Sequence, residues 1–209
     1  MGEATLTKTG TLLINDIEFN ESAPASLVRA TERVWATRLR DQGMIRLNSV
    51  EHYRKVESSE LGDCDEGRGI FHVDGRQYTT GSANEVYIWC CALPDTSTEV
   101  LLNLSPTYDC VLTVTDPITF TKRVNAQLIS MGVVFAPHLG RVAYSRGDEI
   151  TKRALNTQKF SYNIFQKAAI HAHQAEYRLS FTNVSFRRLG LPHIDLRLGD
   201  CTDVVRIET

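Results

Sequence analysis

The chain lacks the long apolar segments that would tie it to a membrane or to export. Its longest uncharged apolar runs, such as residues 86–93, span about eight residues, whereas a membrane-spanning helix needs about twenty. Residues 1–10 have neither the basic start nor the apolar stretch of a secretory signal. We therefore expect a cytoplasmic protein without a membrane partner.

Cysteine is sparse and odd in number. The chain has five cysteines and no pair spaced C-x-x-C, so we do not expect a zinc site built from cysteines. Cys90 and Cys91 are adjacent in a strand-like run, where consecutive side chains point to opposite faces. This pattern favours free thiols in a reducing compartment.

Strong catalytic signatures are also missing. The phosphate-binding loop, the dinucleotide fingerprint, the zinc-protease helix motif and the nucleophile elbow are all absent. Their absence argues against P-loop hydrolases and simple esterases. It leaves functions that are built from residues scattered along the chain.

The composition is that of an ordinary globular protein with an uneven charge distribution. Its 209 residues, 42% hydrophobic and 23% charged, fit a single domain. Residues 1–100 carry 10 Lys and Arg against 16 Asp and Glu, a balance of −6, whereas residues 151–209 carry 9 against 5, a balance of +4. The basic C-terminal third indicates either a surface that attracts phosphates, such as those of a nucleic acid, or simply a solvated face.

The hydrophobic pattern predicts an α+β fold. Strands are expected at residues 11–14, 44–47, 70–73, 86–93, 110–115, 133–135, 141–144, 177–181 and 204–207, and helices at 24–43, 50–55, 117–131 and 149–172. Strand and helix do not alternate regularly, which disfavours a doubly wound parallel sheet. We expect a mostly antiparallel, mixed central sheet flanked by helices, with residues 1–10 flexible.

Two of the expected helices have defined buried faces. In residues 24–43 the apolar positions that share a face include Trp35 and Leu39, which we expect in the core, and Gly43 should end the helix. Asp116 should cap the helix that begins at Pro117. Its buried face should consist of Phe120, Val124, Leu128 and Met131.

The first candidate site is a polar, loop-rich stretch that runs from Gly43 to Gly69. Arg46 and Arg54 could clamp phosphates, and Tyr53 offers a flat face for a base or a nicotinamide. Residues 57–69, which include Glu66, read as a loop at the mouth of a cleft. Two alternatives remain: a solvated loop held by surface ion pairs, or a Mg²⁺ site. The possible metal ligands are Glu57, Asp63, Asp65 and Glu66.

The second candidate site is the segment HAHQAEYRLSF, at the junction of a helix and a strand. In the strand, Glu176 and Arg178 should point to the same side. If that side is buried they form a structural ion pair, and if it faces a cleft, Glu176 could stabilise positive charge on a reacting sugar. His171 and His173 would diverge on a helix and are more typical of cap or surface histidines.

The order of these pieces resembles a broad set of uncharacterised bacterial proteins. The shared pieces lie between residues 35 and 182 and are G-x-I-R-L at Gly43, Y-R-x-x-E at Tyr53, D-x-x-E-G at Asp63, C-V-L-x-V-x-D at Cys110, F-x-K at Phe165 and E-Y-R at Glu176. More remotely, Gln174-Ala175-Glu176 is similar to the Q-x-E element of ADP-ribosyltransferases, including small toxins of bacterial phage defence.

The resemblance to ADP-ribosyltransferases implies roles for six residues. Glu176 would be the catalytic carboxylate, which stabilises an oxocarbenium-like transition state as nicotinamide leaves NAD, and Gln174 would contact the acceptor. Arg46 or Arg54 would hold the NAD pyrophosphate, Tyr53 would stack on nicotinamide, and Glu66 would be a further cofactor contact. No clear Ser-Thr-Ser element follows residue 93.

The leading hypothesis is therefore an NAD-dependent ADP-ribosyltransferase-like enzyme that modifies a nucleic acid or a protein and that a partner antitoxin could neutralise. A second hypothesis is a non-enzymatic module that binds and senses a nucleotide through the same arginines and tyrosine. A third is a metal-dependent nuclease that uses the acidic residues near Glu66.

Overall fold

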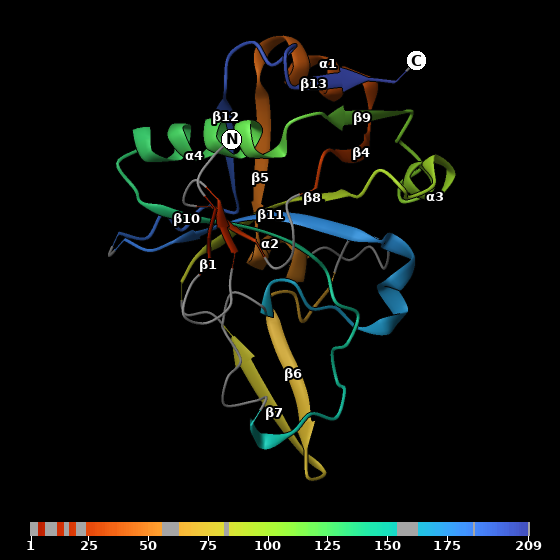
Figure 1. Ribbon diagram of the computed structural model, residues 1–209, viewed down its shortest axis with the longest axis vertical. Coiled ribbons are helices and arrows are strands. Elements are labelled where there is room, and N and C mark those ends of the chain that lie inside the picture. Colours follow the sequence, from red (N-terminus) through yellow and green to blue (C-terminus); the bar gives the residue numbers. More distant parts are fainter. Residues whose placement is uncertain are drawn as a thin grey trace.

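The computed structural model describes residues 4–6, 12–14, 17–19, 24–55, 63–81, 84–153, 163–185 and 187–208. This part of the chain forms an α+β fold with one large, mostly antiparallel sheet and flanking helices, as the sequence predicted. A two-stranded hairpin of β6 (Arg68–Val73) and β7 (Arg76–Gly81) projects from it (Figure 1). No helix of the described residues is long and apolar enough to cross a membrane.

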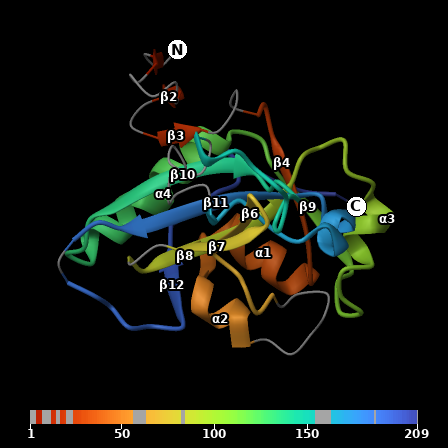
Figure 2. The same cartoon turned by 90° about the horizontal axis from the view of Figure 1, so that it is seen from below.

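In the large sheet, many neighbouring strands come from segments that are distant in sequence (Figure 2). From one edge to the other, the strands are β1 (Ala4–Leu6), β2 (Leu12–Ile14), β3 (Ile17–Phe19), β10 (Phe135–Arg141), β11 (Glu176–Asn183), β8 (Val86–Ala92), β4 (Leu27–Thr31), β9 (Cys110–Val114) and β13 (Val205–Ile207). A branch of β5 (Met44–Ser49) and β12 (His193–Arg197) joins β8 through β5. Only the β3–β10 pairing is parallel among those described.

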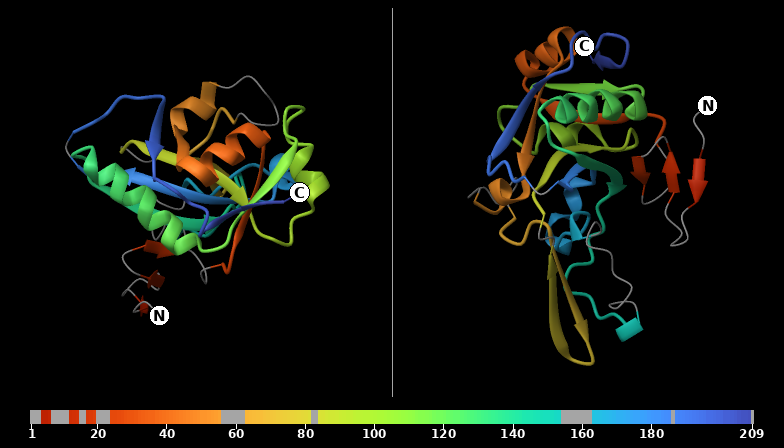
Figure 3. Two further views of the ribbon diagram at one scale, coloured as in Figure 1. Left: turned by 90° about the horizontal axis from the view of Figure 1, so that it is seen from above. Right: turned by 90° about the vertical axis from the view of Figure 1, so that its left-hand side faces the viewer.

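Helices cover both faces of the sheet. The largest hydrophobic cluster joins α1 (Arg33–Gln42) and α4 (Pro117–Ser130) to the strands through residues such as Leu39, Phe120 and Trp89. Figure 3 shows both helices on the same side of the sheet. On the opposite side, α3 (Thr98–Leu102) packs through Leu101 on a smaller cluster that includes Val28. Consecutive residues of β4 thus enter different clusters, because side chains alternate along a strand.

The predicted caps and several elements are confirmed. Gly43 ends α1 with φ of +63°, in the left-handed region. The Asp116 carboxylate accepts a hydrogen bond from the Thr119 backbone N–H at 3.0 Å, which caps α4 at Pro117. The helix predicted over residues 50–55 is α2 (Val50–Lys55). Phe120, Val124 and Leu128 are buried as expected.

The helix predicted over residues 24–43 is wrong over its first nine residues. Leu27–Thr31 is β4, which pairs along its whole length with β9, and only Arg33–Gln42 is helical. The shorter helix turns Trp35 outward, where it is 47% exposed, whereas Leu39 is 4% exposed. The prediction that Trp35 lies in the core is therefore wrong, and that for Leu39 is confirmed.

Other boundaries also differ from the prediction. The strands predicted separately at residues 133–135 and 141–144 are replaced by one strand, β10, which pairs from Phe135 to Arg141 with β11. Met131 lies at the C-cap of α4 and is 37% exposed, so it does not extend the buried face. Of residues 1–10, 4–6 form β1 and the others lie outside the described residues.

The long helix predicted over residues 149–172 is not continuous, because residues 164–168 are not helical. Residues 154–162 lie outside the described residues. Gln166 forms a parallel bridge to Ala143, and Lys167 exchanges backbone hydrogen bonds with Ala143 and Arg146. Residues 152, 153 and 163 are helical, and Ala169–Gln174 forms a 3-10 turn. The extended course of residues 166–168 brings the Lys167 side chain into the interior.

Candidate functional site

A buried network of charges surrounds Arg178 on the central strand β11. The Arg178 side chain is fully buried and donates to both oxygens of Glu66, at 2.6 and 2.9 Å. It also donates from Nε and Nη2 to Oε2 of Glu176, at 2.9 and 2.6 Å, and to the backbone carbonyl of Ile164. Strand alternation predicted that Glu176 and Arg178 share a face, and these contacts confirm it.

Lys167 is the second cation of this network. Its Nζ donates to Oε1 of Gln174 at 2.6 Å and to Oε1 of Glu176 at 3.2 Å. The 3-10 turn ends at Ala175 in the left-handed conformation, with φ of +45°, directly before β11. The Glu176 backbone N–H donates to the Tyr144 hydroxyl at 2.8 Å. These contacts fix the Gln174 and Glu176 side chains next to each other.

The Glu176 carboxylate is ionised at neutral pH. Burial alone would raise its pKa, but the charges of Arg178 and Lys167 outweigh burial and lower the pKa to about 2. A carboxylate has about four acceptor positions, and three are used by the described hydrogen bonds from Arg178 and Lys167. One position on Oε1 is therefore left to accept a hydrogen bond from a ligand.

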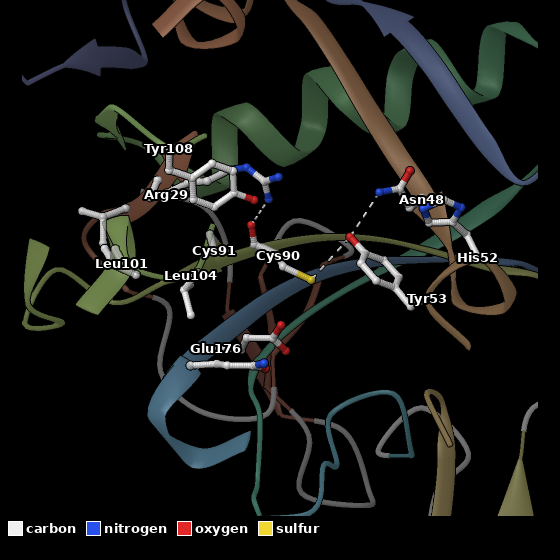
Figure 4. Close-up of a pocket in the computed structure, with 13 residues that line it drawn as sticks. Arg29, Asn48, His52, Tyr53, Cys90, Cys91, Leu101, Leu104, Tyr108 and Glu176 are labelled. Atoms are coloured by element: carbon white, nitrogen blue, oxygen red, sulfur yellow. Dashed lines mark hydrogen bonds between the residues drawn. The ribbon is translucent and has the colours of Figure 1, made fainter. Parts of the chain in front are cut away.

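Glu176 opens onto a cavity of about 320 Å³ (Figure 4). This size lies at the lower end of the range for small-molecule sites, about 300 to 1,000 Å³. The apolar wall comes from β4 and from α3 and the turn after it. The main lining residues are Val28, Arg29, Asn48, His52, Tyr53, Cys90, Leu101, Leu104, Tyr108, Gln174 and Glu176. We call this space the Glu176 cavity.

Tyr53 and Cys90 lie next to each other in the lining of the Glu176 cavity (Figure 4). The Tyr53 hydroxyl accepts a hydrogen bond from Asn48 at 3.2 Å and lies 3.9 Å from the Cys90 sulfur. Burial raises the pKa of Tyr53 well above its usual value and raises that of Cys90 to about 11. Both groups are therefore neutral at physiological pH, and Cys90 is not poised as a thiolate nucleophile.

Arg29 supplies positive charge to the lining of the Glu176 cavity, and sequence reasoning missed it. Its guanidinium lies 5.0 Å from the centroid of the Trp89 ring and donates to the backbone carbonyl of Cys90. A single arginine inside the apolar run LVRAT was the available signal. From the sequence, this run was assigned to a helix. On a helix, Arg29 would be an ordinary solvent-facing residue, so it was not considered as a site residue.

The structure brings together three of the six predicted site residues. Glu176, Gln174 and Tyr53 all line the Glu176 cavity. Arg46 does not; it pairs with Asp195 at 2.7 Å and lines an adjacent cavity.

Arg54 and Glu66 also lie away from the Glu176 cavity. Arg54 donates to the backbone carbonyl of Glu66 at 2.6 Å and lines a third cavity. Glu66 is 1% exposed and supports Arg178 instead of forming a rim.

The acidic loop does not gather its carboxylates around a common point in the described residues. Asp63 is buried against Arg146 at 2.6 Å, and Asp65 pairs with Arg68 at 3.1 Å. Glu57 lies outside the described residues. The described residues contain no group of three or more His, Cys, Asp and Glu side chains that could hold a metal ion. The predicted loop over 57–69 is described only from Asp63, and its last two residues, 68 and 69, belong to β6.

The Glu176 cavity thus combines a fixed carboxylate, an amide, an arginine and a neutral aromatic ring. Such a set can bind a flat or cationic group against Tyr53 and Glu176 and an anionic group against Arg29. No protein-family model, curated protein or solved structure matches this chain.

Proposed function

We propose that the chain is an NAD-dependent ADP-ribosyltransferase-like enzyme and that the Glu176 cavity receives the nicotinamide end of NAD. The observation that carries this proposal is the convergence of Glu176, Gln174 and Tyr53 on one cavity. These residues come from β11, the preceding 3-10 turn and α2, and the resemblance to ADP-ribosyltransferases had given each of them a role at the reacting centre.

The reaction breaks the bond between the ribose C1′ and the nicotinamide nitrogen. The electron pair of that bond leaves with nicotinamide, which becomes neutral, and positive charge develops on the ribose. Glu176 stabilises this charge because its carboxylate is ionised and held in place by Lys167 and Arg178. An acceptor nucleophile then bonds to C1′ and loses a proton to water. The products are ADP-ribosyl acceptor, nicotinamide and a proton.

The other groups bind and orient the substrate. Tyr53 stacks on the nicotinamide ring, which carries positive charge before cleavage. The free position on Glu176 Oε1 accepts a hydrogen bond from a ribose hydroxyl. Arg29, rather than Arg46 or Arg54, attracts the pyrophosphate, because it is the arginine among the described residues that lines the Glu176 cavity. Gln174, anchored by Lys167, contacts the acceptor.

The proposal extends to the setting in which the protein acts. All five cysteines are free, which suits a reducing, cytoplasmic compartment where NAD is present. The acceptor would be a protein or a nucleic acid. A toxin of this kind would need a neutralising partner in the cell that makes it.

A non-enzymatic nucleotide sensor is the second candidate. Lys167 and Arg178 already balance the Glu176 charge, so the cavity needs no bound cation to be stable. A carboxylate that is held by two cations without a ligand suits a preformed binding pocket. The nuclease hypothesis has less support, because Asp63, Asp65 and Glu66 are each paired with an arginine.

Nicotinamide release and thermal shift together test the proposal. The protein is incubated with NAD, and free nicotinamide is measured by chromatography. Glu176→Gln should reduce release by about a hundredfold or more. Its melting temperature should stay high enough for the assay, because Arg178 keeps its two bonds to Glu66. The matched control is Glu99→Gln, an exposed position on α3, which should not change release.

Tyr53 gives an independent arm of the same experiment. Tyr53→Phe keeps the ring and should retain most of the NAD affinity, whereas Tyr53→Ala should weaken it by about tenfold. A thermal shift with NAD but no nicotinamide release would favour the sensor. Wild-type release by Glu176→Gln would remove Glu176 from the mechanism and the transferase proposal with it.

A further inference from the structure

A second cavity of about 400 Å³ adjoins the Glu176 cavity. Arg29 and Asn48 line both spaces, so the two are neighbours across these residues. The second cavity lies between α1 and the strands β4, β5, β8 and β12. We call it the tryptophan groove, because Trp35 and Trp89 both line it.

One wall of the tryptophan groove is an aromatic ring that lies outside the hydrophobic core, that of Trp35. Trp35 is 47% exposed even though the Arg38 guanidinium lies 4.8 Å from its ring centroid. Arg29 lies at a similar distance, 5.0 Å, over the buried ring of Trp89. An accessible indole beside arginines is the arrangement with which proteins stack nucleobases.

The charge of the groove is positive. Arg29, Arg38 and Arg46 line it, against the single carboxylate of Asp195. Asp195 is engaged by Arg46 through two bonds, at 2.7 and 2.8 Å. The guanidinium groups of Arg29 and Arg38 thus supply the excess charge, and guanidinium groups match the oxygens of a phosphate well.

We propose that the tryptophan groove binds a nucleoside phosphate. The base stacks against Trp35, and the phosphate lies between Arg29 and Arg38. The volume of the groove falls in the range that small-molecule sites occupy, about 300 to 1,000 Å³. The site shares Arg29 with the proposed NAD site but contains none of the residues proposed for the cleavage itself, because neither Glu176 nor Gln174 lines it. The same chemistry can come from a free nucleotide or from a single-stranded nucleic acid.

Intrinsic fluorescence reports directly on this groove. The chain has two tryptophans, and both line the groove, so a stacked base should quench the emission excited at the red edge of the tryptophan band. AMP is the probe, with adenosine lacking the phosphate and inorganic phosphate lacking the base. We expect saturable quenching by AMP and an affinity at least about tenfold weaker for either fragment.

Matched variants assign the effect to the groove. Trp35→Phe should remove most of the AMP-dependent quenching, whereas Trp89→Phe should retain it, because Trp89 is buried beneath Arg29. Arg38→Gln should weaken AMP binding by about tenfold, and the exposed Arg206→Gln on β13 should not. Far-UV circular dichroism checks that each variant is folded.

Two further measurements distinguish a free nucleotide from a single-stranded nucleic acid as the ligand. They also separate this proposal from the proposed cleavage of NAD. A single-stranded oligodeoxyadenylate that binds more tightly than AMP, with affinity falling steeply as salt rises, identifies a nucleic-acid strand; equal affinities identify a free nucleotide. Glu176→Gln protein should bind AMP as the wild type does, whatever its nicotinamide release. Absence of saturable quenching by both ligands, or an unchanged affinity in Arg38→Gln and Trp35→Ala, would overturn the proposal.

Discussion

The guanidinium of Arg178 on β11 is joined by two hydrogen bonds, of 2.6 and 2.9 Å, to the carboxylate of Glu66, which lies just before β6. Arg178 also neutralises Glu176. The same cation therefore holds the loop that carries Glu66 and the candidate catalytic carboxylate.

Replacing Arg178 by methionine should be strongly destabilising. Arg178→Met keeps the length of the side chain but leaves Glu66 and Glu176 facing each other without their shared cation. The expected loss in the free energy of unfolding, measured with urea, is about 3 to 5 kcal/mol. As a control, Arg123→Gln breaks a surface pair with Asp203 and should have a much smaller effect. Equal losses in the two variants would contradict a structural role for the buried network.

Stability should fall in acid through Glu176. Because the folded-state pKa is lowered to about 2 from an ordinary value of 4.5, the stabilisation is complete above pH 4.5 and is lost as pH falls toward 2. Glu176→Gln should be less stable than the wild type at neutral pH and should lose less stability over this interval. Unfolding midpoints measured from pH 7 to pH 2 check the prediction, and parallel profiles for the two proteins would count against it.

Two neighbouring positions on α1 should respond differently to truncation. Leu39→Ala removes a side chain that is 4% exposed and should cost about 2 to 5 kcal/mol. Trp35→Ala removes a larger side chain that is 47% exposed, and we expect a loss of only about 1 kcal/mol. Urea unfolding of both variants tests the observed helix face, and a larger loss at Trp35 would show that the face is wrongly placed.

Gly43 should tolerate no side chain. A Cβ at this position would lie 2.2 Å from the Gly199 carbonyl oxygen, in addition to the strain of φ +63°. Gly43→Ala should therefore cost about 3 kcal/mol or more. Gly132 has φ of +76°, and a Cβ added there would meet no atom within 4 Å, so Gly132→Ala isolates the backbone strain and should cost about 1 to 2 kcal/mol. Similar losses would argue against the close approach of Gly199.

Local signals in the sequence predicted much of the fold. Strand alternation placed Glu176 and Arg178 on one face, and the Asp116–Pro117 pair predicted the start of α4. These features depend on neighbours within a few residues, so they can be read from the sequence. The apolar run at Leu27 was assigned to a helix. Five residues are too few to distinguish the helical spacing of apolar residues from the strand spacing, and the pairing of this run with β9 joins segments distant in sequence.

The candidate site was predictable only in its local part. Gln174 and Glu176 were predicted from a short motif and Tyr53 from the polar stretch around it, and the structure adds Arg29 to the same cavity. Glu66 was predicted as a cofactor contact in a loop, but it is buried against Arg178, which is 112 residues away, and no spacing rule predicts such a contact. Arg46 and Arg54, which were predicted to hold phosphates, do not line the Glu176 cavity for the same reason: the order of strands decides which arginines face a cavity.

The position of β11 has a consequence for synthesis on the ribosome. This strand separates β10 from β8 and is hydrogen-bonded to both, yet it consists of residues Glu176–Asn183, which are made after all of β1 to β10. The growing chain therefore carries two strand edges that have no β11 partner until this segment emerges. Unpaired edges of this kind favour aggregation, so nascent chains that stall before residue 176 should depend on chaperones far more than the finished protein does.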